Sequence, residues 1–243
     1  KLLVTSNNET LNSDEIKVLN NVIEGNYRLK QEDRRLSNII PFLGIETTGS
    51  LASRISMWHG KGSHAKVFDN AEDRIDFNVA RIFGFEMGPI LQDPIALPPT
   101  LGYLFHRIQT SLDGTPTIVV LDEAWALIDN PVFAPKIKDW LKVMRKLNAM
   151  VVFATQSVED ATKSAISDTL VQQTATQIFL PNMRATETYQ SMFMLSDKEF
   201  DLVKTIDPAS RFFLVKQETR TAIARINLSG MMDAIHILSG RAE

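Results

Sequence analysis

The sequence predicts an α/β protein with a mostly parallel sheet flanked by helices. Two observations favour this class. Short runs of β-branched and aliphatic residues, which are typical of strands buried on both faces, recur along the chain, and amphipathic helical patterns separate them. The clearest runs are 117–121 and 150–155. With 243 residues, the chain is long enough for one large domain or for one and a half domains.

Composition and charge exclude several classes of protein. The net charge of −3 is no general signature of nucleic-acid binding, so a DNA contact would need a local basic patch. The absence of cysteine excludes disulfides and thiolate metal sites, and it fits a cytosolic protein. There is no run of 18 apolar residues and no signal-peptide pattern. Because the sequence starts and stops abruptly, we expect it to be an excerpt from a longer protein.

Residues 1–48 are predicted to form helices joined by polar turns. The polar run 12–15 is a helix-start signal, apolar residues follow it on one helical face, and Gly25 is expected to end this helix. Leu51, Ile55 and Trp58 then recur at helical spacing. Packing of these helices around a core is the better interpretation of the whole region.

A short glycine-rich run at 60–63 superficially resembles a phosphate-binding loop. Such a loop needs the pattern GxxxxGK[ST] between a strand and a helix, so that its amides and the helix dipole face the phosphates. Here a helix precedes the glycines and a strand-like run, 65–68, follows them, so we reject this interpretation. No other stretch of the sequence matches the pattern.

The middle of the chain predicts a strand, a crossover helix and a second strand in series. Residues 80–87 are interpreted as a buried strand, 94–99 as a loop, and the spacing of apolar residues from 101 to 112 predicts a helix. The strand at 117–121 follows. A right-handed βαβ unit is the expected arrangement.

Two carboxylates, Asp122 and Glu123, follow the strand at 117–121 directly. Charges at the end of a buried strand are costly unless something uses them, and open α/β sheets bind ligands at the carboxyl ends of their strands. This pattern is that of a Walker B motif, with Asp122 holding Mg²⁺ and Glu123 activating the attacking water. The alternative is a helix whose first turn is acidic because of the helix dipole.

Residues 136–148 form the clearest amphipathic helix, which is basic outside its apolar face. That basic surface is either a functional patch or an ordinary solvated face. The strand at 150–155 follows and delivers Gln156 to the same sheet edge as Asp122, provided that the strands are parallel. A glutamine there can bond to a γ-phosphate or to the attacking water, but taken alone Gln156 is better interpreted as an ordinary strand-end residue before a helix cap at Ser157.

The C-terminal part predicts a strand, two helices and a strand pair. The strand is 176–180, and Ser196 to Glu199 is a capping box that opens a helix through Lys204. Residues 211–216 and 221–228 alternate as a strand pair, and 231–238 form a short helix.

The ordered motifs LDEAW (121–125), RK (145–146), ATQS (154–157) and FLPN (179–182) are more specific than a Walker B motif alone. They resemble the C-terminal ATPase domain of the fourth VirB protein family of type IV secretion systems, whose relatives include TraC, TrbE and CagE. The segments SLASRISMWHGKG, VFDN, FGFEMG and LFHRI are also similar to that family. The resemblance covers about residues 45 to 230.

The resemblance implies a RecA-like P-loop NTPase fold of the FtsK/HerA type that hydrolyses ATP with Mg²⁺. It also implies a hexameric homo-oligomer at the cytoplasmic face of a bacterial inner membrane, held there by other subunits of the secretion complex. Such ATPases are thought to energise pilus biogenesis, conjugation and protein secretion.

Carried over by position, Asp122 matches the metal-side aspartate, Glu123 the catalytic glutamate, and Gln156 the glutamine of the next strand, in contact with nucleotide or water. Arg145, with its neighbour Lys146, and Arg184 lie near the family's later motifs. One of these basic residues is expected to reach a neighbouring subunit's nucleotide as an arginine finger.

The departure from the family is the missing Walker A motif. We therefore expect residues 1–60 to be a helical segment within the ATPase domain and 61–243 to be the RecA-like core with Walker B. Walker A and an N-terminal domain are expected upstream, so this chain alone should not hydrolyse ATP. Two alternatives stay open: a DNA translocase of the FtsK/HerA group, with the 136–146 helix lining a pore, and a non-catalytic scaffold subunit.

Overall fold

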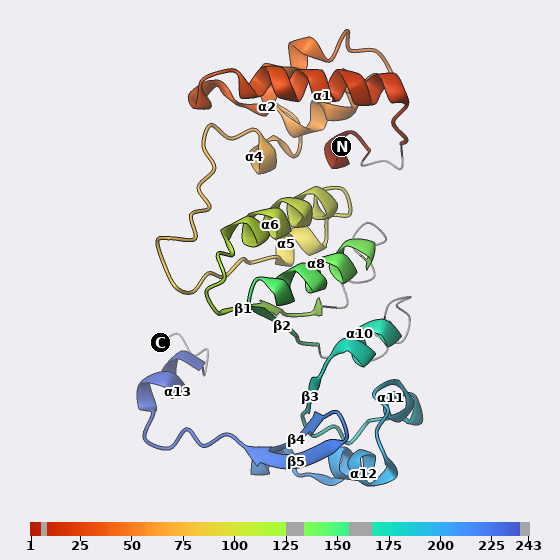
Figure 1. The fold of residues 1–243 in the computed structure, drawn as a ribbon, viewed down its shortest axis with the longest axis vertical. Helices are drawn as coiled ribbons and strands as arrows, with labels where there is room; N and C mark the ends of the chain where they lie inside the picture. Colours follow the sequence, from red (N-terminus) through yellow and green to blue (C-terminus); the bar gives the residue numbers. More distant parts are fainter. Residues whose placement is uncertain (6–8, 125–133, 156–166, 239–243) are drawn as a thin grey trace. The chain divides into compact units, whose positions relative to one another are not determined.

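The computed structural model describes residues 1–5, 9–124, 134–155 and 167–238. It divides into two compact units. The first comprises residues 1–121 and 130–153, and the second comprises 122–129 and 154–243 (Figure 1). Among the described residues, no helix combines the length and the hydrophobicity that crossing a membrane requires.

The first long helix of the first unit is α1, Ser13–Tyr27, which begins at the predicted position. The Asn12 side chain accepts the amide of Glu15 at 2.9 Å, and Glu15 accepts the amide of Asn12 at 2.9 Å. This reciprocal capping box satisfies amides that the first helical turn leaves without partners. The prediction that Gly25 ends the helix is wrong. The helix runs on to Tyr27, whose carbonyl oxygen accepts a hydrogen bond from the Arg34 guanidinium at 2.9 Å.

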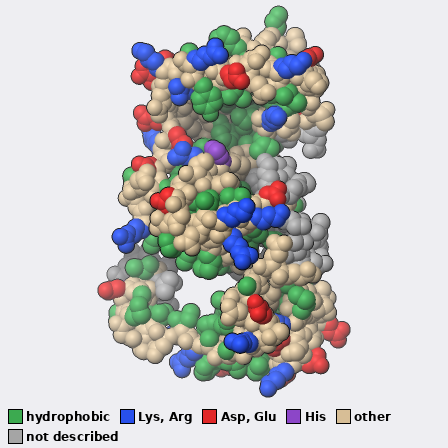
Figure 2. Space-filling model, viewed as in Figure 1, with side chains coloured by type: hydrophobic (Ala, Val, Ile, Leu, Met, Phe, Trp, Pro, Cys, Tyr) green, Lys and Arg blue, Asp and Glu red, His purple; other side chains and the backbone are tan. Residues whose placement is uncertain are grey.

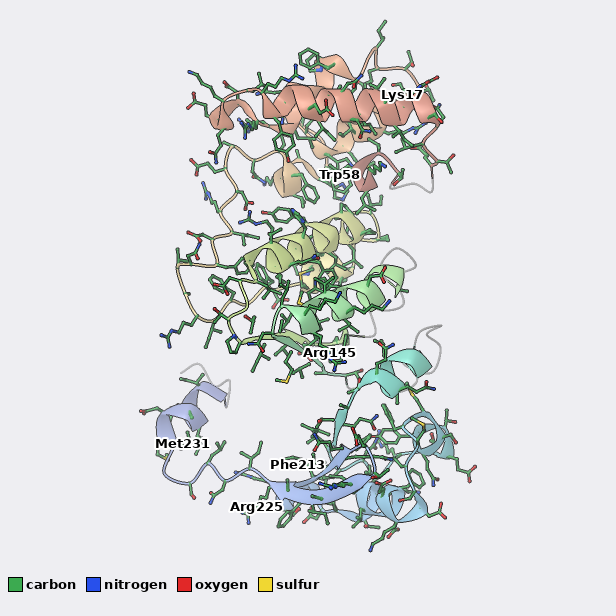
Figure 3. All side chains as sticks on the ribbon, in the orientation of Figure 1. Lys17, Trp58, Arg145, Phe213, Arg225 and Met231 are labelled. Carbon is green, nitrogen blue, oxygen red and sulfur yellow. The ribbon has the colours of Figure 1, made fainter. Side chains whose placement is uncertain are left out.

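Trp58 is the centre of the first hydrophobic core. Its side chain is fully buried (0% exposed), and its indole Nε1–H donates to the Leu3 carbonyl at 2.9 Å (Figure 3). Leu51 and Ile55 are buried in the same cluster, which confirms the helical spacing predicted for them. The elements of this region are η1 Leu2–Val4, η2 Gln31–Asp33, α2 Leu36–Ile39, η3 Ile40–Phe42, α3 Leu51–Ile55, η4 Ser56–Trp58, α4 Ala65–Phe68 and α5 Gly88–Leu91.

Two predicted strands are wrong. Residues 65–68 form helix α4, in which Ala65 is buried and Phe68 lies edge-on to Trp58 at 5.6 Å between ring centroids. Residues 80–87 have no regular structure, so the predicted βαβ unit that begins with them is not formed. Their aromatic rings contact Phe77 rather than a neighbouring strand, and Ile82 is 89% exposed.

Helix α6, Leu97–Ser111, precedes strand β1, Thr117–Leu121, and helix α8, Ala134–Lys146, precedes strand β2, Ala149–Phe153. Helix α6 begins at Leu97, inside the predicted loop, because a proline is tolerated in the first helical turn. The two strands pair in parallel from Thr117↔Ala149 to Leu121↔Phe153, as the sequence predicts. A parallel pair needs a long crossover, and the connection that contains α8 supplies it.

The two faces of this parallel pair differ. On one face, Val119 packs with Trp140 and Met144 of α8, and Phe105 of α6 lies 4.7 Å from the Trp140 ring. The opposite face is exposed, although parallel sheets usually bury both faces. It presents the apolar side chains of Ile118, Val120, Met150 and Val152.

The second unit contains a three-stranded antiparallel sheet in the order β3–β4–β5. Only two residues connect β4 and β5, and Glu218 in that link has a left-handed backbone (φ 54°), which suits a tight hairpin. Leu214 of β4 is fully buried against helices α11 and α12. The elements are α10 Ser167–Gln173, β3 Thr176–Phe179, α11 Glu187–Met192, α12 Asp197–Thr205, η5 Pro208–Ser210, β4 Phe212–Gln217, β5 Arg220–Arg225 and α13 Met232–Leu238.

Glu199 joins helix α12 to the sheet of the second unit. It forms the predicted capping box with Ser196, and its carboxylate also accepts hydrogen bonds from Thr221 and from Lys216, the latter at 3.2 Å. Burial by itself would raise the pKa of Glu199. The hydrogen bonds from Thr221, Ser196 and Lys216 outweigh burial and lower the pKa from the usual 4.5 to about 2.

We expect Trp58→Phe to destabilise the first unit by about 2 kcal/mol, because it removes a buried hydrogen bond and leaves a small cavity. Urea unfolding followed by circular dichroism measures this loss. Phe42→Leu, at an exposed position of the same region, is the control and should change stability little. Equal stability of Trp58→Phe and the parent protein would contradict the central role of Trp58.

We expect Glu199→Gln to destabilise the second unit by about 1–2 kcal/mol at pH 7. Because the pKa of Glu199 is lower in the folded state, its contribution is complete above about pH 5 and is lost as the pH falls from the unfolded value of 4.5 towards about 2. The variant should therefore lose less stability than the parent over that range. Urea midpoints at pH 7, 4 and 3 test this, with the exposed Glu187→Gln as control; parallel pH profiles would refute it.

Candidate functional site

The two predicted carboxylates, Asp122 and Glu123, directly follow β1 in the chain. The backbone turns sharply here, because Glu123 has a left-handed conformation with φ 50°. The Asp122 Oδ1 atom accepts the amide of Glu123 at 3.1 Å. The Asp122 side chain is exposed, whereas Glu123 is partly buried. The two carboxylates therefore follow the end of a strand that is buried on one face only: Val119 is buried, whereas Ile118 and Val120 are exposed, so the prediction of a strand buried on both faces is wrong.

A second hydrogen bond fixes the residue after them. The amide of Ala124 donates to the carbonyl oxygen of Ala154 at 3.1 Å, and Ala124 is only 1% exposed. Ala154 directly follows β2 in the chain, as Asp122 follows β1. Sequence reasoning missed both alanines as parts of the site, and the only signal for them was their place inside the LDEAW and ATQS motifs.

The donor set at Asp122 fits a magnesium ion that is held mainly by other ligands. Carboxylate oxygens are ligands that Mg²⁺ prefers, and only one Asp122 oxygen has a hydrogen bond within the described residues. Residues 1–5, 9–124, 134–155 and 167–238 contain no group of three or more His, Cys, Asp or Glu side chains that could hold a metal. In nucleotide-binding proteins Mg²⁺ usually takes several of its ligands from phosphate oxygens and water.

The other predicted site residues are not gathered around these carboxylates by contacts that the structure describes. Arg145 lies on α8 with an exposed side chain (Figure 3), and it belongs to the other compact unit. Arg184 is exposed in the turn after β3, where its amide donates to Asn182 Oδ1 at 3.0 Å. No ion pair of either arginine is found among the described residues. Gln156 lies outside the described residues.

The glycine-rich run at 60–63 is a structural turn. The Gly60 amide donates to Asp69 Oδ2 at 3.1 Å, and the Gly62 amide donates to the His59 carbonyl at 2.9 Å. A Cβ atom on Gly62 would lie 2.4 Å from the Met57 carbonyl oxygen, so close packing accounts for this glycine. Because these two amides are already bonded within the protein, they are not available to bind phosphates.

A parallel strand pair with a helical crossover and paired carboxylates after its first strand is the arrangement expected in an α/β domain of the P-loop NTPase class. Residues 54–230 match the model of the TraG P-loop domain. The chain belongs to this family.

Three curated relatives show the same relationship over the whole chain. The chain is 35% identical over 243 residues to type IV secretion system protein virB4 of Bartonella henselae, and this alignment covers 99% of the chain and 31% of the relative. It is 31% identical to virB4 of Brucella suis and 32% identical to PtlC of Bordetella pertussis, covering 100% of this chain and 31% and 30% of these relatives. The chain thus spans less than a third of their length.

A solved structure has the same fold. VirB4 of Thermoanaerobacter pseudethanolicus superposes with a TM-score of 0.68, covering 93% of this chain and 67% of that chain. At 17% sequence identity, this likeness establishes the fold alone. Together with the match to the TraG P-loop domain, it confirms the predicted P-loop NTPase fold class.

Proposed function

We propose that this chain is part of an ATPase subunit of a type IV secretion system, in which ATP hydrolysis energises pilus biogenesis and substrate translocation. The observation that carries the proposal is the pair Asp122 and Glu123 at the end of the parallel strand β1. The names of the relatives support the same biological setting. Because the chain spans only part of those proteins, the activity belongs to the full-length protein.

The two carboxylates have different roles in this proposal. Asp122 is exposed and keeps one oxygen for Mg²⁺, directly or through water, and a bound ion would neutralise charge on the phosphate oxygens. Glu123 orients the attacking water and accepts its proton as the water attacks the γ-phosphorus in line. Gln156 is the proposed hydrogen-bond partner of the γ-phosphate or of that water.

The proposed assembly is a homo-oligomeric ring, hexameric in the family pattern, which other secretion subunits hold at the cytoplasmic face of the inner membrane. In such a ring an exposed arginine can approach the nucleotide of a neighbouring subunit, where its guanidinium would stabilise negative charge on the phosphates. Arg184 and Arg145 both have exposed side chains without an ion pair among the described residues. Both are therefore candidates for this contact in trans.

A DNA translocase is the second candidate function, because α8 carries a local basic surface. Lys142, Arg145 and Lys146 are exposed, and Figure 2 shows Lys and Arg side chains gathered over this helix. The overall net charge of −3 weighs against an extended nucleic-acid surface. A non-catalytic scaffold is disfavoured by the intact carboxylate pair.

In the full-length protein, Glu123→Gln should reduce ATP hydrolysis at least about 100-fold, because the water loses its base, while ATP still binds. Phosphate release and binding of a fluorescent ATP analogue measure the two effects. Glu218→Gln is a matched control, since Glu218 also has a left-handed backbone but lies in the β4–β5 hairpin. Undiminished hydrolysis by Glu123→Gln would rule out the proposed function.

We expect a trans arginine to reveal itself by complementation. Full-length Glu123→Gln and Arg184→Ala proteins, each inactive alone, should regain activity when mixed before assembly, because an intact Glu123 can then face a neighbour's intact arginine. Random mixing in a ring makes roughly a quarter of the interfaces competent. The same mixture with Arg145→Ala tests the other candidate. For an arginine that is essential but acts within its own subunit, the mixture would stay inactive.

A further inference from the structure

The backbone of Glu123 is held in a conformation that this residue type seldom adopts. Its φ is 50°, in the left-handed region, where a side chain with a Cβ atom crowds the following carbonyl oxygen. Such a conformation persists only where the surrounding structure holds it. Something next to Glu123 therefore stabilises this turn.

The amides on both sides of the Glu123 side chain are hydrogen-bonded. Its own amide donates to Asp122 Oδ1 at 3.1 Å, and the following amide, of Ala124, donates to the Ala154 carbonyl at 3.1 Å. The Ala124 methyl group is also buried, with 1% of the residue exposed. The first bond is local to the turn, whereas the second ties the turn to a residue thirty positions further along the chain.

We propose that Ala124 is a positioning residue for Glu123. Its amide fixes the peptide after Glu123 against Ala154. Its buried methyl group prevents the turn from relaxing, so that the carboxylate of Glu123 stays beside the water that attacks the γ-phosphorus. This inference rests on the proposed ATPase function and adds to it a residue that touches neither substrate nor metal.

The size of the side chain at position 124 follows from this role. Glycine would keep the amide but would add backbone freedom and remove the buried methyl group, so the left-handed turn could relax. Serine would keep the Cβ atom and add only one small atom. A displacement of about 1 Å at the reacting group is enough to reduce turnover strongly while substrate binding is retained.

The test uses the full-length protein and steady-state ATP hydrolysis. Ala124→Gly should lower kcat about tenfold or more, with KM for ATP within about twofold of the parent value. Ala124→Ser should restore kcat to within about threefold of the parent. Ala96→Gly is the matched control: Ala96 is also 1% exposed and its amide donates to Asp93 at 2.9 Å, but it lies at the start of α6. Its kcat should be unchanged.

The outcomes separate this inference from the function on which it rests. If Glu123→Gln hydrolyses ATP normally, the proposed function fails. If Glu123→Gln is inactive but Ala124→Gly has the kcat of the parent protein, only the positioning role fails. The same holds if Ala124→Gly and the Ala96→Gly control show the same changes in kcat and KM. Should Ala124→Gly not fold, Ala154→Gly loosens the acceptor side of the same bond. A kcat equal to that of the parent protein in that variant would likewise overturn the inference.

Discussion

The parallel pairing of β1 with β2 is the constraint on which the candidate site depends. In a parallel pair both strands end at the same edge, so the residues after Leu121 and after Phe153 emerge together. A parallel pair also needs a long crossover, and α8 supplies it while packing Trp140 and Met144 against Val119. Burying the apolar side of α8 leaves its other side for polar and charged side chains, and Lys142, Arg145 and Lys146 are exposed there.

The sequence was sufficient to predict those elements whose hydrophobic pattern and length indicate the same secondary structure. The β1 strand, the amphipathic α8, the β2 strand and the capping box at Ser196 are strong signals, because periodicity and local hydrogen bonding point to the same structure. The run at 80–87 misled because short apolar runs do not specify a partner, and here its aromatic rings contact Phe77. Gly25 misled because a glycine is tolerated inside a helix whose end is stabilised elsewhere, in this chain by Arg34.

The candidate site shows the same limit. The position of Asp122 and Glu123 directly after a strand could be predicted, since it needs only an apolar run followed by two carboxylates. The left-handed turn could not, because glutamate carries no signal for positive φ. The hydrogen bond between Ala124 and Ala154 depends on the register of β1 against β2, which the sequence alone does not specify. The roles of Arg145 and Arg184 depend on a neighbouring subunit, and no single chain can show that contact.

The uncovered face of the parallel pair has a consequence for anyone who handles this polypeptide. Ile118 and Val120 are 63% and 61% exposed, and Met150 and Val152 of the neighbouring strand extend the same stripe. Contiguous β-branched and aliphatic surface of this kind drives chains to adhere to one another, and it does so most strongly while a sheet is still being completed. Concentration and time spent partly folded will therefore govern the yield of this chain as much as its thermodynamic stability does.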